Sequence, residues 1–119
     1  MKSIFSSTFI LLIVLISTSA TAQTMQNGSW SVNQSLAAYS LDKNNGDRTM
    51  TIEVDFETSF TKKPQIFLSV TQIDSDKEYN LRYNVEAMSI SRDGFTIKVR
   101  TWADSKIFSI SGNWLATTQ

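Results

Sequence analysis

The side chains best suited to chemistry fall in two short segments, residues 74–82 and 101–108. A sugar presents polarised C–H groups on one face and hydroxyls around its edge, so a sugar site needs an aromatic ring and fixed polar groups. Trp102 and Phe108 could supply rings, and Arg82 a planar fork of donors. The side chains that could accept hydrogen bonds from sugar hydroxyls are Asn45, Asp74 and Asp104.

The same residues also allow a purely structural explanation. Trp102 and Phe108 could close the end of a hydrophobic core, while Arg82 pairs with Asp74 or Asp104. Trp102 ends a run of alternating residues and enters a turn, where a polar side chain would be expected. Residue types alone therefore leave both explanations open.

Catalytic and metal-binding alternatives receive less support. The chain has no histidine and no cysteine, which removes the usual base of Ser-His triads, thiol catalysis and the commonest transition-metal ligands. Asp74 and Asp104 could act as the two carboxylates of a glycosidase. The acidic run 74–78 lacks the glycine and the distal glutamate of an EF-hand calcium loop. We therefore expect no enzyme activity, no cofactor and no metal.

The first 22 residues have the pattern of a secretory signal peptide. Lys2 precedes the apolar run 10–16, and the small residues Ala20 and Ala22 favour cleavage before Gln23. The apolar run is shorter than the roughly 20 residues needed to span a bilayer, so we expect no membrane insertion. Residues 23–119 would then form one secreted, extracellular domain.

Composition narrows the possible partners of that domain. Without Lys2 it has ten Lys and Arg against eleven Asp and Glu, and its cations are scattered, so nucleic-acid binding is not expected. A small secreted domain often depends on disulfides. This chain lacks cysteine, so it must gain its stability from efficient packing, from association with other copies, or from both.

Alternating hydrophobicity predicts an all-β domain. In residues 49–56 the apolar side chains occupy every second position, as in a half-buried strand. The predicted strands are 28–32, 49–56, 65–73, 81–89, 95–101 and 108–116. Within the third, Ile66, Leu68, Val70 and Gln72 are predicted to share one face. Six short antiparallel strands favour a β-sandwich.

The connections between these strands carry their own predictions. Residues 91–94 predict a hairpin turn, with Gly94 available for a positive φ. Residues 33–48 predict a loop with one short helical turn at 35–39. The two chemical segments each join two strands, so they are expected at an end of the sandwich, where a rigid framework presents binding side chains.

The order of several motifs resembles the H-type lectin domain, the module of snail agglutinins and discoidins. The resemblance rests on the runs 69–74, 80–83, 94–96 and 101–109, closed by Trp114, and it covers nearly all of residues 23–119. It implies a six-stranded antiparallel β-sandwich that forms a homotrimer, sometimes paired into a hexamer. It also implies binding of terminal galactose or N-acetylgalactosamine in clefts between protomers.

The resemblance assigns expected roles to individual residues. Arg82 matches the sugar-binding arginine of the family, and Trp102 matches its aromatic plate. Phe108 stands where the family usually has tyrosine, so a hydroxyl is lost. Ala103 stands where a snail agglutinin has histidine, which leaves preference for the N-acetyl group open. Asn45, with Asn44 and Asp47 as alternatives, matches the residue contributed by the neighbouring protomer.

Two functions of different classes follow from the sequence. The first is a multivalent lectin that uses several weak sites on one rigid oligomer for adhesion, recognition or agglutination. The second is a structural or protein-interaction module that keeps the fold but has lost sugar binding.

Overall fold

The protein folds entirely into β-structure in the computed structural model, which describes residues 24–118. The predicted signal peptide lies outside the described residues. The strands are β1 (Met25–Asn33), β2 (Arg48–Asp55), β3 (Gln65–Ser75), β4 (Asn84–Met88), β5 (Gly94–Thr101) and β6 (Ile107–Thr117). No helix occurs among the described residues, so the helical turn predicted at 35–39 is wrong; hydrogen-bonded turns lie there instead. Accordingly, the described chain holds no helix that could cross a membrane.

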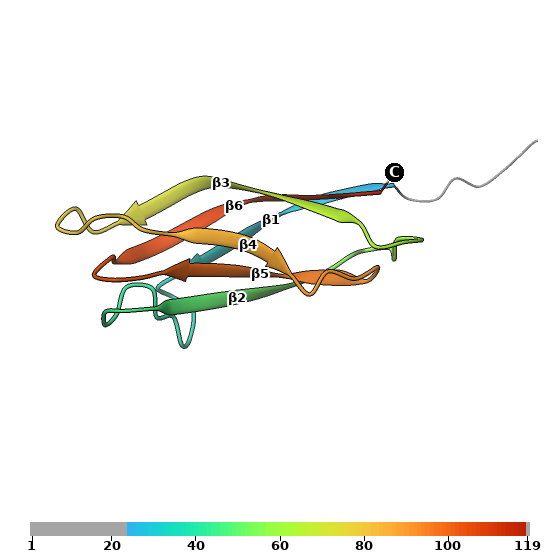
Figure 1. The fold of residues 1–119 in the computed structure, drawn as a ribbon. Helices are drawn as coiled ribbons and strands as arrows, with labels where there is room; N and C mark the ends of the chain where they lie inside the picture. The colour runs from blue at the N-terminus through green and yellow to red at the C-terminus, as the bar shows by residue number, and fades with distance from the viewer. Residues whose placement is uncertain (1–23, 119) are drawn as a thin grey trace, which may run out of the picture.

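The strands form two three-stranded sheets, ordered β1-β6-β3 and β2-β5-β4 (Figure 1). Every neighbouring pair is antiparallel. The sheets face each other as the two layers of a sandwich, which confirms the predicted fold class. Because successive strands run in opposite directions, the β1–β2, β3–β4 and β5–β6 loops all emerge at the same end of the sandwich.

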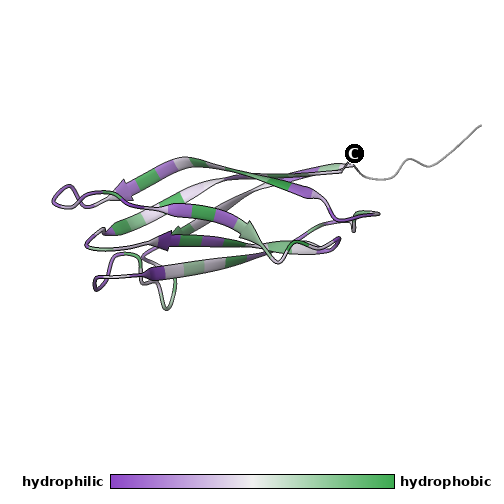
Figure 2. Cartoon of the chain, in the orientation of Figure 1, coloured by the Kyte–Doolittle hydropathy of each residue, from purple (hydrophilic) through white to green (hydrophobic). Residues whose placement is uncertain are grey.

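The core lies between the two sheets and is filled by alternate residues of each strand. Ile97 and Val99 of β5 and Ile110 of β6 are fully buried, as the period-two pattern predicts. Figure 2 shows the same alternation of hydrophobic and hydrophilic residues along β3, β4 and β5. The apolar face predicted for residues 49–56 is likewise the inner face of β2.

A β-bulge in β3 corrects the predicted face of Gln72. Val70 pairs with Gly112 and Gln72 with Ser111, so Thr71 is an extra residue without its own partner in the ladder. The extra residue reverses the alternation that follows it. Ile73 therefore packs against the core, and Gln72 is exposed. An unbroken alternation in the sequence could not reveal this inserted residue.

The fourth strand begins three residues later than predicted. Leu81 and Tyr83, which continue the alternation of Val85 and Ala87 in the predicted strand, are 44% and 41% exposed. The backbone before Asn84 is hydrogen-bonded to the side chains of Thr101, the last residue of β5, and Ser105, instead of to a backbone ladder. The inner positions that remain in β4 are Val85 and Ala87, as predicted.

Gly94 does not have the positive φ that the sequence suggested; glycine is needed there because β5 comes very close to β2. The positive-φ glycine of the described chain is Gly46, and Ser89, just before the predicted turn, has a φ of 54°. A Cβ on Gly94 would lie 2.2 Å from the carbonyl oxygen of Val54. Only glycine lets β5 begin this near to β2.

Candidate functional site

Three loops meet at the end of the sandwich opposite the C-terminus: 34–47, 76–83 and 102–106 (Figure 1). Hydrogen bonds join them directly. The amide of Gly46 donates to the carbonyl of Ala103 at 2.9 Å, and the amide of Asp76 donates to the carbonyl of Lys106 at 2.9 Å. The fold therefore brings together the two segments that the sequence singled out, and adds a third.

The backbone of Arg82 is held on both sides by buried hydroxyls. Its amide donates to Oγ of Ser105 at 3.0 Å, and its carbonyl accepts a hydrogen bond from Oγ1 of Thr101 at 2.5 Å. Both hydroxyl residues are fully buried. Ser105 also donates to the carbonyl of Asn80. These bonds replace the strand ladder that the sequence predicted here, and they fix where the Arg82 side chain starts.

The guanidinium of Arg82 reaches into solvent beside Asp104. Nη1 of Arg82 lies 2.7 Å from Oδ1 of Asp104, in an ion pair whose side chains are 32% and 51% exposed. Of the two partners considered from sequence, Asp104 is the one found. Within residues 24–118, the Nε and Nη2 groups of Arg82 have no acceptor, so the pair presents donors and acceptors side by side to solvent.

Trp102 lies two residues before Asp104 in the chain and is half-buried. The guanidinium carbon of Arg100 lies 4.7 Å from the centre of its ring, and Nη2 of Arg100 pairs with Oδ1 of Asp47 at 2.7 Å. Such stacking helps to fix the orientation of the indole. Arg100, near the end of β5, was not predicted from the sequence as a partner of Trp102.

Ala103 adopts a left-handed backbone conformation with a φ of 58°. Its carbonyl accepts hydrogen bonds from the amide of Gly46 and from Nη2 of Arg48, the latter at 3.0 Å. A non-glycine residue rarely has a positive φ without support from its surroundings. The turn between Trp102 and Asp104 is thus shaped by contacts with the β1–β2 loop.

Asn45 lies on the β1–β2 loop and contacts the β5–β6 loop of its own chain. Its Oδ1 accepts a hydrogen bond from Nζ of Lys106 at 2.8 Å, and the same ammonium lies 5.4 Å from the centre of the Tyr79 ring. Asn45 is exposed. A contribution to a neighbouring protomer stays a prediction, since the structure contains one chain.

Asp74 and Phe108 lie apart from the Arg82–Asp104 pair. Asp74 is exposed on β3, and no hydrogen bond or ion pair in the described part of the chain links it to Arg82. Phe108 is half-buried on β6, and its carbonyl accepts a hydrogen bond from the amide of Gln34 at 3.1 Å. None of the ring contacts among residues 24–118 joins Phe108 to Trp102. Their predicted roles in binding stay predictions.

A buried tyrosine supports the loops from below. The hydroxyl of Tyr39 donates to the carbonyl of Ile107 at 2.7 Å. Burial raises the pKa of Tyr39 above its ordinary value, and the carboxylate of Asp42 raises it further. The described residues contain no cluster of three potential metal ligands. The site therefore offers an aromatic ring, an ion pair and amide groups on fixed loops.

Comparison with known proteins places this arrangement in a family. The sequence profile of the H-type lectin domain matches residues 51–117. The chain belongs to the H-type lectin domain family. It is 33% identical over 72 residues to a protein called ATP synthase subunits region ORF 7 from Fuscovulum blasticum, a match that covers 60% of this chain and 63% of that protein.

Two discoidins of Dictyostelium discoideum resemble the chain in sequence or in fold. A discoidin-1 polypeptide is 30% identical over 78 residues, covering 65% of this chain and 31% of that polypeptide. The structure of recombinant discoidin II superposes with a TM-score of 0.70 at 21% identity, covering 78% of this chain and 36% of that one. The chain thus spans less than two thirds of the length of these relatives.

Proposed function

We propose that this protein is a secreted, non-enzymatic lectin that binds terminal galactose or N-acetylgalactosamine. The observation that carries the proposal is the exposed ion pair between Arg82 and Asp104, 2.7 Å apart, on the loop that also carries the half-buried Trp102, two residues before Asp104. Family membership supports it, because the fold is one that lectins share. The ring and the ion pair are the two kinds of group that a sugar needs.

The chemistry of galactose suits these groups. Its axial 4-hydroxyl leaves a continuous patch of C–H groups on one face, which can stack on Trp102, and places adjacent hydroxyls on the neighbouring edge. The free donors of Arg82 and the acceptor oxygens of Asp104 can bind such a pair of hydroxyls. The ion pair orients both side chains before sugar binds, so less conformational freedom is lost on binding.

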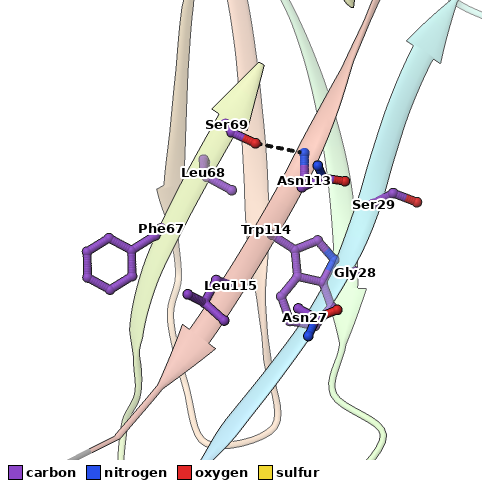
Figure 3. A pocket seen from close by; sticks show the side chains of 9 residues that line it. All are labelled: Asn27, Gly28, Ser29, Phe67, Leu68, Ser69, Asn113, Trp114 and Leu115. Carbon is purple, nitrogen blue, oxygen red and sulfur yellow. Dashed lines mark hydrogen bonds between the residues drawn. The ribbon is translucent and has the colours of Figure 1, made fainter. Parts of the chain in front are cut away.

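We further propose that the lectin is a homo-oligomer in which Asn45 reaches the site of a neighbouring protomer. The outer face of the β1-β6-β3 sheet supports assembly. A groove of about 660 Å³ lies on it, between strands β1, β3 and β6 (Figure 3). The residues lining it are uncharged: Asn27, Gly28, Ser29, Phe67, Leu68, Ser69, Asn113, Trp114 and Leu115.

An uncharged groove suits contact between identical copies. Near a rotation axis each residue meets its own counterpart, so a charged side chain there would face a like charge. Phe67, 54% exposed, and Leu115 give this groove apolar surface that association would bury. The opposite sheet has charged outer positions instead, including Glu86, Lys98 and Asp55. The homotrimer that the family resemblance implies would use this uncharged groove.

A glycan-binding measurement tests the sugar site. The mature protein should bind galactose-terminated glycans, with soluble galactose and N-acetylgalactosamine as competitors and glucose as an inactive control. Trp102→Ala should weaken binding at least tenfold without a large change in melting temperature. Thr51→Ala, at an exposed position on β2, should change neither the binding nor the melting temperature. Unchanged binding by Trp102→Ala, or its failure to fold, would contradict the proposal.

Mixed oligomers test the contribution of the neighbouring protomer. Trp102→Ala and Asn45→Ala protomers should each bind poorly alone. Co-assembled, they should regain binding, because the Trp102 of one protomer and the Asn45 of the other complete a shared site. A mixture that binds no better than its parents would place Asn45 outside the site or within its own protomer.

The protein-interaction alternative rests on Phe108, which lacks the hydroxyl that the family usually has. If sugar binding has been lost for this reason, the wild type should not bind galactose-type glycans, and Phe108→Tyr should restore binding. Binding by the wild type would remove this alternative.

A further inference from the structure

We propose that Arg48 is a positioning residue that fixes two binding loops at once, one for the site of its own protomer and one for the site of its neighbour. The inference rests on the proposed function and extends it. Arg48 begins β2, is 6% exposed, and its hydrogen bonds within residues 24–118 go to backbone carbonyls. It would act on binding entirely through the loops that it holds.

The guanidinium of Arg48 donates to carbonyls of both loops. In the β5–β6 loop, Nη1 donates to the carbonyl of Ser105 at 2.7 Å and Nη2 to that of Ala103 at 3.0 Å. In the β1–β2 loop, Nε donates to the carbonyl of Gly46 at 3.0 Å, and Nη1 to those of Lys43 at 3.0 Å and Leu41 at 3.4 Å. One side chain therefore bridges the segment just before it to residues that lie 55 and 57 positions after it in the sequence.

This contact set is specific to arginine. A buried cation must be stabilised by hydrogen-bond acceptors. In the described structure the acceptors of Arg48 are backbone carbonyls, and none of the ion pairs there includes Arg48. The planar fork points donors in several fixed directions, so it can serve both loops together. Lysine keeps the charge but has one ammonium group, which cannot reach carbonyls on both sides.

The two loops carry different parts of the proposed site. The β5–β6 loop presents Trp102 and Asp104 to the sugar of its own protomer, and the β1–β2 loop presents Asn45 to the next. Arg48 holds the carbonyl of Ala103 between them, at the residue with a positive φ. A shift of this guanidinium would move both surfaces, so each Arg48 supports two sites of the oligomer.

Arg48→Lys in the full-length mature protein tests the proposal against a purely structural role. Val99→Ala, a fully buried position in the middle of β5, serves as a control that lowers the melting temperature without touching either loop. Arg48→Lys should weaken binding of galactose-terminated glycan at least tenfold at a temperature where both variants are folded, and Val99→Ala should bind like the wild type. Equal binding by the two variants would overturn the proposal.

Mixed oligomers separate the two loops. In a mixture of Arg48→Lys and Trp102→Ala protomers, a complete site combines the β5–β6 loop of Arg48→Lys with the Asn45 of Trp102→Ala, so this mixture tests the β5–β6 loop. In a mixture of Arg48→Lys and Asn45→Ala protomers, a complete site combines the β1–β2 loop of Arg48→Lys with the Trp102 of Asn45→Ala, so this mixture tests the β1–β2 loop. If Arg48 positions both loops, neither mixture should reach the affinity of the Trp102→Ala and Asn45→Ala mixture. Full recovery in either mixture would show that only one loop depends on Arg48.

Amide hydrogen exchange tests the inference without any sugar, and so distinguishes its failure from failure of the lectin proposal. The amide of Gly46 bonds to the carbonyl of Ala103, and that of Ile107 bonds to the carbonyl of Leu41 at 3.0 Å. In Arg48→Lys both amides should exchange at least tenfold faster, while the amide of Phe60, at the far end, should be unchanged. Unchanged exchange at Gly46 and Ile107 would overturn the positioning role even if the wild type binds glycans.

Discussion

The two ends of the sandwich are closed by different kinds of interaction. At the aromatic end, defined by Phe56, Phe60, Phe95 and Trp114, rings pack against one another, with the Phe56 and Phe60 centroids 4.9 Å apart in a T-shaped pair. At the polar end, defined by Arg48, Thr101 and Ser105, buried side chains bond to the backbone of the loops.

This difference separates stability from orientation. Ring packing buries apolar area and tolerates small displacements, so it contributes mainly to the free energy of unfolding. Hydrogen bonds require particular distances and angles, so each one fixes the position of the loop that it holds. The proposed sugar site lies at the polar end, where its side chains need defined positions.

The largest effect on stability is expected at the aromatic end. Phe60→Ala should lower the free energy of unfolding by about 3–5 kcal/mol, because it removes a buried ring and leaves a cavity. Glycan affinity of the remaining folded protein should not change. Denaturant unfolding at one protein concentration measures the first, and binding at low temperature the second. Met88→Ala, an exposed position on β4, is the control, and an equal loss there would contradict the ring-packing argument.

A smaller loss of stability, with a loss of binding, is expected from Ser105→Ala. The change leaves the amide of Arg82 and the carbonyl of Asn80 without their partner, which costs about 1–3 kcal/mol in a buried place. Arg82 would then be less well oriented, so glycan affinity should fall as well. Calorimetry of unfolding and of binding, with Thr51→Ala alongside, separates the two effects. Wild-type affinity in Ser105→Ala would show that the hydroxyl does not orient Arg82.

Two exposed ion pairs allow a sharper test of the polar end. Asp104→Asn and Glu86→Gln each weaken an ion pair, the first with Arg82 at 2.7 Å and the second with Lys98 at 4.0 Å. Each should change stability by less than about 1 kcal/mol. Only Asp104→Asn should reduce glycan binding, by about tenfold or more. If both variants bind equally well, Asp104 is not part of the site.

The smallest effect is a loss of stability in alkali that depends on Tyr39. Its folded pKa lies above its ordinary value, so the unfolded chain releases this proton first as the pH rises through 10. The contribution of Tyr39 is complete below pH 10 and should fall by under about 1 kcal/mol at pH 10.5. Tyr39→Phe should be less stable than the wild type at neutral pH, but it should not show the loss of stability that ionisation of Tyr39 causes above pH 10. Parallel loss in both proteins between pH 9.5 and 10.5 would assign the effect to other groups.

Much of the fold could be predicted because burial on one face of a strand leaves a period-two pattern. That pattern gave the inner faces of β2 and β5 correctly. It failed at Thr71, because a bulge inserts a residue without changing residue types, and at Leu81 and Tyr83, whose alternation continues beyond the end of the ladder. At Gly94 the residue types of the predicted turn suggested a positive φ, whereas close contact with β2 is what requires glycine there.

For the site, the sequence indicated Arg82, Trp102 and Asp104 as chemically suitable groups on two loops. It gave no sign of Arg48 or Ser105, whose types are common on surfaces, nor of the stacking of Arg100 on Trp102. Partners of this kind are separated by many residues, so local patterns cannot identify them.

By itself, then, the sequence determined an all-β sandwich with its polar and aromatic side chains in particular loops, since alternation and composition act locally along the chain. Only the tertiary structure decided that Arg82 pairs with Asp104, that Trp102 lies against Arg100, and that Arg48 joins the β1–β2 loop to the β5–β6 loop. The physical reason is that hydrogen bonds and ion pairs depend on distances of about 3 Å between groups remote in sequence, which strand packing alone sets.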